Sequence, residues 1–126
     1  MTELTTDGYQ SLREFAVSAH TAPNQWDYIG LYDQFEDEYA RIQISSSNNL
    51  TWTDLDGDNI VTISGEITGG NENIPLGDTT VRYLAVHDSA TGGRQISKRN
   101  QIAPFVFNQP GDIMNVTLNI EMPRLE

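Results

Sequence analysis

The stretch DIMNVTLNIEM at residues 112–122 decides the fold class of this chain of 126 residues. Apolar and polar residues alternate along it. The apolar set is Met114, Val116, Leu118, Ile120 and Met122. Because successive side chains of a β-strand point to opposite faces, this alternation predicts a strand with one face in a core and the other in solvent.

The same two-residue period extends back through most of the chain. Clusters of turn-forming residues separate the apolar runs, for example SSSNN at 45–49 and NQPGD at 108–112. The runs predict seven strands, at 25–32, 38–44, 50–53, 60–67, 79–87, 102–107 and 112–122. Pro104 places its strand at a sheet edge or a bulge, because proline donates no ladder hydrogen bond. We therefore expect a mainly β protein, an antiparallel and jelly-roll-like β-sandwich.

The predicted strand at 79–87 has apolar residues on both faces. Strict alternation puts one set of side chains on the same face, namely Val81, Tyr83 and Ala85. It puts a second set on the other face, namely Arg82, Leu84 and Val86.

One short helix is expected before the strands, at about 7–20. Its apolar residues follow a 3.6-residue period and are Leu12, Phe15, Ala16 and Ala19. Thr6 or Asp7 can cap its start, and Pro23 lies beyond its end. No repeat or long linker interrupts the chain, so we expect a single domain over residues 1–126.

The charge balance excludes several classes of partner. Lys and Arg number 7 against 18 Asp and Glu, for a net charge of −11. Such a chain repels phosphate, so we expect it to bind neither nucleic acid nor an anionic membrane. Cysteine is absent, which excludes disulfides and thiol catalysis. The first 20 residues lack a signal-peptide pattern, and we expect synthesis in a cytoplasm.

Asp54, Asp56 and Asp58 form the one candidate metal site. They stand at every second position of a turn, the spacing at which side chains converge on calcium. The rest of a calcium loop is missing, since Gly65 stands where a bidentate glutamate belongs. Asp56-Gly57 is first a hairpin-turn signal. We expect a turn, no bound metal and no cofactor.

Candidate catalytic residues are few. His20 and His87 are the only histidines, and His87 is followed by Asp88 and Ser89, the letters of a catalytic triad. Neighbouring residues at a strand end point in different directions, however, and a triad is recognised by its geometry. The acidic turn FEDE at 35–38 is typical of a solvated loop. We expect no catalytic residues and no enzyme activity.

The aromatic run at 25–32 has two interpretations. Trp26, Tyr28 and Tyr32 form either an exposed ladder that stacks on sugars or part of a strand with two buried faces. We favour the buried interpretation. Polar, glycine-rich segments at 68–78 and 88–100 are the expected contact loops.

Several short motifs, in order, resemble a group of small tailed-phage and prophage virion proteins. They are YIGL at 28–31, YAR at 39–41, LTW at 50–52, VRYLAVHDSATGG at 81–93, which ends in HDSATGG, and PGD at 110–112. The likeness extends from about residue 7 to residue 122. His87 departs from the family pattern, which has small or apolar residues there, and the segment 68–78 is longer and more acidic.

The resemblance implies a non-enzymatic β-sandwich in the virion. Its first implication is a capsid decoration (cement) protein on the outer shell that binds the major capsid protein and assembles as a homo-oligomer, with a trimer favoured. A tail or fibre-base component of the same virion is the alternative. From another class, a free calcium- or carbohydrate-binding β-sandwich module remains open.

Overall fold

The computed structural model describes residues 2–17, 26–54, 60–70 and 74–121. Within them the protein is mainly β, as predicted, with one α-helix and seven strands. The elements in chain order are α1 (Thr6–Val17), β1 (Tyr28–Asp33), β2 (Glu38–Gln43), the 3₁₀ turn η1 (Ser46–Asn48), β3 (Leu50–Asp54), β4 (Ile60–Thr68), β5 (Thr80–His87), β6 (Asn100–Val106) and β7 (Ile113–Glu121).

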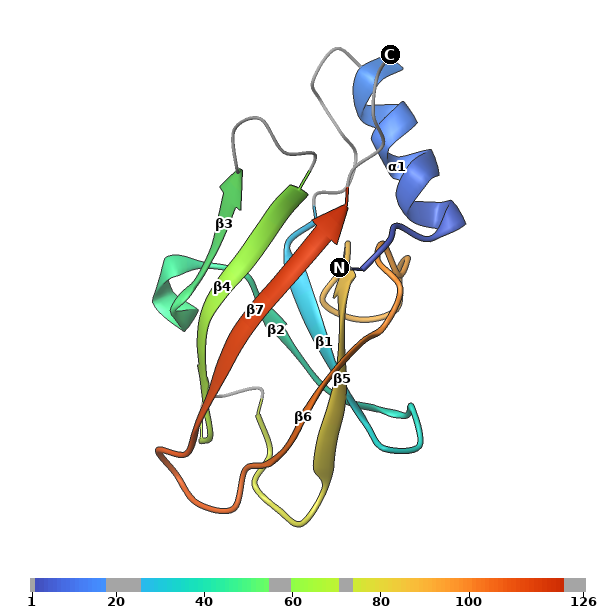
Figure 1. The fold of residues 1–126 in the computed structure, drawn as a ribbon. Coiled ribbons are helices and arrows are strands. Elements are labelled where there is room, and N and C mark those ends of the chain that lie inside the picture. Colours follow the sequence, from blue (N-terminus) through green and yellow to red (C-terminus); the bar gives the residue numbers. More distant parts are fainter. Residues whose placement is uncertain (1, 18–25, 55–59, 71–73, 122–126) are drawn as a thin grey trace.

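The strands form two antiparallel sheets (Figure 1). One sheet has the order β2-β1-β5-β6 and the other the order β3-β4-β7. Three hairpins, β1–β2, β3–β4 and β5–β6, each stay within one sheet, and the chain changes sheet between them. Seven strands in two antiparallel sheets confirm the predicted mainly β, antiparallel fold class.

Side chains from both sheets build a single hydrophobic core. The four-stranded sheet contributes Ile29 and Leu31, and the three-stranded sheet contributes Ile63 and Leu118. The alternation predicted for the last strand is confirmed, because the side chains at 114, 116, 118 and 120 are buried and those between them are mostly exposed. Met122 lies outside the described residues. The short period of two was thus enough to identify this core face.

A bulge in β5 corrects the predicted face of Val81. The pairing of β5 with β6 shifts between Val81 and Tyr83, so alternation is interrupted at Arg82. As a result Val81 joins Leu84 and Val86 in the core instead of sharing a face with Tyr83. An extra residue in one strand reverses side-chain parity beyond it.

The edge position predicted for Pro104 is confirmed. Pro104 lies in β6, the last strand of its sheet.

The opposite sheet ends at β7, and the N-terminal segment lies along that strand's final residues. The Thr2 N–H donates to the Asn119 carbonyl at 2.9 Å, and the Glu121 N–H donates to the Thr2 carbonyl at 2.9 Å.

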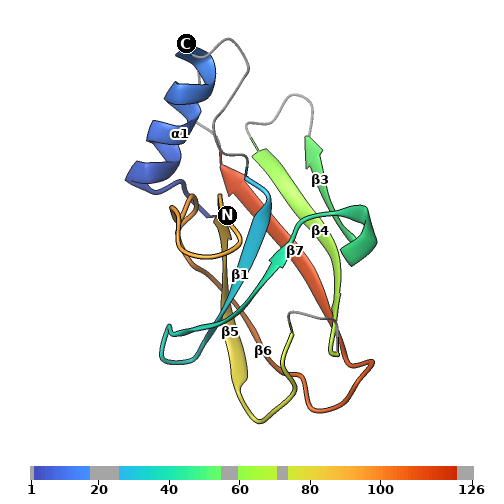
Figure 2. The same ribbon diagram turned by 180° about the vertical axis from the view of Figure 1, so that it is seen from behind.

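The cap of α1 lies one residue before the first predicted cap, Thr6. Thr5, and not Thr6 or Asp7, caps α1, because its hydroxyl accepts the N–H of Gly8 at 3.0 Å. The Thr5 N–H donates to the carbonyl of Ile96 at 2.8 Å, which holds the helix start on the segment after β5. The side chains predicted for the apolar helix face lie outside the described residues. Figure 2 shows α1 beside one end of the sheets.

Candidate functional site

The predicted metal residues give no described site. Asp54 closes β3, but its side chain and the whole of Asp56 and Asp58 lie outside the described residues. His20 lies outside them as well. The described part of the chain holds no group of three or more His, Cys, Asp or Glu side chains placed to bind a metal. None of its helices is long and apolar enough to cross a bilayer.

His87, at the end of β5, is the centre of a polar cluster on the four-stranded sheet. Its side chain is buried, and its Nε2 shares a hydrogen bond with the hydroxyl of buried Tyr32 on β1. The two rings are stacked with centroids 5.9 Å apart. Tyr32 lies on the face opposite Ile29 and Leu31, because side chains alternate along β1. We call Tyr32, Glu38, Arg41, His87 and Arg99 the His87 cluster.

The cluster is not a catalytic triad. The Ser89 hydroxyl donates to Asp88 at 3.2 Å, whereas the ring of His87 turns to Tyr32. The Nδ1 atom of His87 has no hydrogen-bond partner among the described residues. Both side chains are buried, and their hydrogen bond joins β1 to the end of β5.

Burial keeps His87 neutral. Burial, and after it the nearby Arg41 guanidinium, lower the pKa of His87 to about 4. The Glu38 carboxylate, 3.8 Å from Nε2, acts in the opposite direction without reversing the shift. Burial likewise raises the pKa of the Tyr32 hydroxyl. Both groups therefore carry no charge at neutral pH.

Gly30 makes room for the imidazole. A Cβ at this position would lie 2.8 Å from Nε2 of His87 and 3.1 Å from a carboxylate oxygen of Glu38. Gly30 pairs with Ala85 on one side and Arg41 on the other. The middle of the sheet thus has a gap in its side-chain layer, and the His87 ring fills it.

Arg41 binds the loop that follows β5. Its guanidinium donates to the carbonyls of Ser89 and Gly92, each at 2.8 Å, and to the carboxylate of Glu38 at 2.9 Å. These charge-assisted bonds join β2 to a loop almost fifty residues away in sequence.

The same loop is closed by an internal ion pair. Asp88 accepts the backbone N–H of Arg94 at 2.8 Å and its Nε at 2.9 Å. Burial alone would raise the pKa of Asp88, but these bonds and that of Ser89 hold it below its ordinary value. Gly93 has a φ of 70°, and a Cβ there would lie 2.5 Å from the Asp88 carboxylate. Only glycine fits this position without strain.

Arg99 covers the other end of the cluster. Its guanidinium lies 4.2 Å from the centre of the Tyr32 ring, a cation–π contact. It also donates to the carbonyl of Glu36 at 2.9 Å. The segment 88–99, which makes up most of the contact loop predicted at 88–100, is therefore fixed to the sheet at both ends.

Three of the sequence motifs meet in this cluster. Gly30 comes from YIGL, Arg41 from YAR, and the loop from His87 to Gly93 from HDSATGG. Their side chains and backbone bond to one another although they are far apart in the chain. No local sequence pattern predicts these contacts, because the side-chain periodicity of a strand does not show which other strands pair with it.

The aromatic residues of the run at 25–32 are largely covered. Tyr32 is buried, and Trp26 packs against the core and donates its Nε1–H to Ser11 at 2.9 Å. Trp52 in turn donates to the Trp26 carbonyl at 3.1 Å. This arrangement agrees with the buried interpretation for Trp26 and Tyr32 and leaves Tyr28 half-buried.

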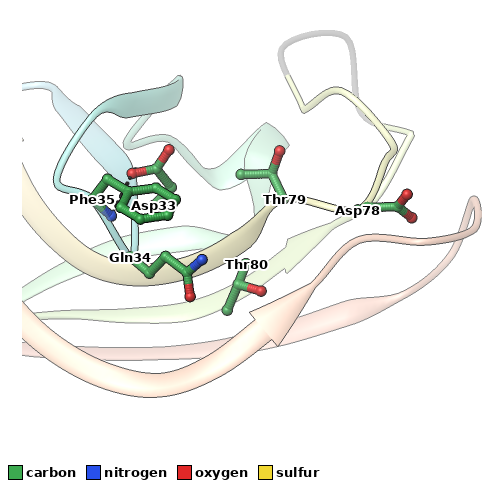
Figure 3. Close-up of a pocket in the computed structure, with 6 residues that line it drawn as sticks. All are labelled: Asp33, Gln34, Phe35, Asp78, Thr79 and Thr80. Carbon is green, nitrogen blue, oxygen red and sulfur yellow. Dashed lines mark hydrogen bonds between the residues drawn. The ribbon is translucent and has the colours of Figure 1, made fainter.

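A surface hollow lies at the end of the sheets farthest from α1. It has a volume of about 270 Å³ and lies between the turn after β1 and the start of β5 (Figure 3). Its lining residues are Asp33, Gln34, Phe35, Asp78, Thr79 and Thr80. The sequence marked 68–78 as a contact loop but treated the turn at 35–38 as ordinary solvated chain. The unusual feature is Phe35, an aromatic residue among acids, which is 76% exposed.

Five of the seven Lys and Arg side chains bind their own chain. Arg41, Arg94, Lys98 and Arg99 pair with carboxylates, and Arg82 donates to the carbonyl of Ile102. The protein therefore offers other molecules a mainly negative surface.

Comparisons with protein-family models, with curated proteins and with solved structures found no match to this chain.

Proposed function

We propose that this protein is a non-enzymatic structural component of a tailed-phage virion that binds the outer capsid surface as a decoration protein. The observation that carries the proposal is the meeting of YIGL, YAR and HDSATGG in the His87 cluster. These motifs resemble those of virion proteins. In the fold, Arg41 of YAR binds the carbonyls of the loop after β5, and Gly30 of YIGL leaves room for the His87 ring. Residues that carry the resemblance thus interact in the fold, which supports the proposal, although His87 itself departs from the family pattern.

Physical properties of the chain suit a lattice-bound protein. A decoration protein binds at many equivalent positions, so modest contacts per copy add up when copies also contact one another. Fixed loops favour such binding because little chain entropy is lost on docking. The negative exterior would limit association between particles. We expect a homo-oligomer, with a trimer favoured at local threefold positions.

Quantitative mass spectrometry of purified virus particles tests this function. The copy number of the chain is measured against the major capsid protein, with a tail protein of the same particle as an internal scale. A ratio near parity supports decoration. A few copies per particle would instead place the protein in the tail or fibre base. Absence from purified particles would overturn both placements.

A further inference from the structure

The exposed apolar side chains gather at one end of the protein. Four large hydrophobic residues are exposed in the described part of the chain. Phe35 (76%) and Leu76 (41%) lie in loops, and Ile113 (48%) is the first residue of β7 after a third loop. We call residues 33–37, 75–80 and 108–113 the loop end. It lies opposite α1 (Figures 1 and 2).

Contacts between the loops make the loop end one surface. The Gly77 N–H donates to the Phe107 carbonyl at 2.9 Å, which joins the second loop to the third. The hollow beside Phe35 is lined by Asp78 and Thr79, which brings the first loop next to the second. Most of the loop end is exposed to solvent.

The loop end is acidic as well as apolar. It contains five acids and neither lysine nor arginine; the acids are Asp33, Glu36, Asp37, Asp78 and Asp112. Arg99 reaches Glu36, 3.7 Å from its carboxylate, and the other described cations bind elsewhere in the chain. Asp78 has no hydrogen bond or ion pair within the described residues. The surface therefore complements a basic and apolar partner.

The hollow has the chemistry to receive a guanidinium group. Asp33 accepts the N–H of Phe35 at 2.8 Å and that of Asp37 at 3.0 Å, which fixes the turn and presents the aromatic ring. Asp78 lines the other side of the hollow, beyond Thr79 and Thr80, with its carboxylate directed away from Phe35 (Figure 3). Arginine pairs with carboxylates and stacks on aromatic rings, and this hollow offers both kinds of group.

We propose that the loop end is the face that docks on the capsid, with Phe35 entering an apolar site and an arginine of the capsid protein entering the hollow. This inference rests on the proposed function and names the surface that performs it. A second copy of the chain is a poor occupant, because two loop ends would bring ten carboxylates together.

Re-binding to particles that lack the protein tests the docking face. Particles of the encoding virus are purified without this chain and titrated with the purified protein, and the bound chain is measured per capsid protein. Phe35→Ser should weaken binding about tenfold or more, as the loss of an aromatic interface residue does. Asp78→Asn should weaken it several-fold and reduce its dependence on salt, since one screened charge pair is removed.

Matched controls come from the opposite end. Tyr9→Ser removes an aromatic residue that is 39% exposed on α1, and Glu121→Gln removes an exposed acid at the end of β7. Both should bind like the wild type. Circular dichroism and thermal melting show whether each variant is folded, and little change is expected because all four side chains are exposed.

The outcomes separate the two proposals. If the wild type binds particles and both loop-end variants bind equally well, the docking face is wrong while the decoration function stands. Equal losses in the control variants would likewise overturn the docking face. If the wild type does not bind, both proposals fail. If Phe35→Ser dissociates an oligomer without reducing particle binding, the loop end is a contact between copies, and the inference is overturned.

Discussion

The hydroxyl of Tyr32 on β1 and the imidazole of His87 at the end of β5 are hydrogen-bonded and buried on the sheet face opposite the core. The pair joins the middle of the four-stranded sheet to the loop after β5. A neutral histidine is required there, because burial and Arg41 both disfavour its charged form. This requirement makes the stability of the protein depend on pH.

Acidification should destabilise the protein through His87. Its pKa is about 4 when folded and about 6.5 in an unfolded chain, so between these values the unfolded state binds the proton and the folded state does not. The free energy of unfolding should fall by about 3 kcal/mol as the pH drops from 7 to 4. Asp88, whose folded pKa is depressed, loses its contribution only at still lower pH. Urea unfolding at several pH values measures the slope, and His87→Gln should flatten it. An equally steep slope in that variant would contradict the assignment.

Gly30→Ala should destabilise the protein by about 1–3 kcal/mol, because the new methyl group would overlap the His87 ring. Gly77→Ala is the matched control, since a Cβ there meets no atom within 4 Å. Thermal melting of both variants checks the expectation. A fall in melting temperature as large for Gly77→Ala as for Gly30→Ala would argue against a specific close contact at Gly30.

Arg41→Met should release the loop after β5. The variant loses the bonds to Ser89 and Gly92, and charge-assisted hydrogen bonds of this kind contribute about 1–3 kcal/mol. Hydrogen exchange should rise most in residues 88–94. The control is Lys98→Met, which breaks an exposed pair with Glu3 and should leave that loop unchanged. If residues 88–94 exchanged their amide hydrogens equally fast in both variants, Arg41 would not be what holds the loop.

Leu118→Ala should cost about 2–5 kcal/mol, because it empties a fully buried site in the core. Ile113→Ala lies on the same strand, but its side chain is 48% exposed, so its cost should be much smaller. Chemical denaturation of both variants gives the two free energies. A neutral Leu118→Ala would contradict the position of β7 in the core.

Calcium should not stabilise the protein. The sequence predicts a turn at 54–59, and we expect no shift in melting temperature at millimolar calcium. A tight site at Asp54, Asp56 and Asp58 would raise the melting temperature as calcium increases, because a ligand bound only by the folded state stabilises it. Such a rise, abolished by Asp56→Ala, would favour the calcium-binding alternative.

The sequence by itself determined the strands, the core face of β7 and the edge position of β6. Each depends on local rules: a period of two for side chains, turn-forming residues between strands, and the missing N–H of Pro104. These rules failed at Val81, where a bulge reversed the parity, and at the helix start, where Thr5 was preferred because it also contacts the Ile96 segment. The bulge depends on how β5 pairs with β6, and the cap depends on the contact between Thr5 and Ile96. Neither partner can be identified from the neighbouring sequence.

Only the tertiary structure decided which distant residues interact. Gly30, Arg41 and His87 meet because β1 pairs with both β2 and β5, and the same pairing brings Phe35 and Asp78 to one hollow. In sequence His87 is merely a histidine before an aspartate and a serine, and Phe35 is an apolar residue in an acidic turn. Strand order sets both roles. It is fixed by packing of the whole core, which no single stretch of the chain encodes.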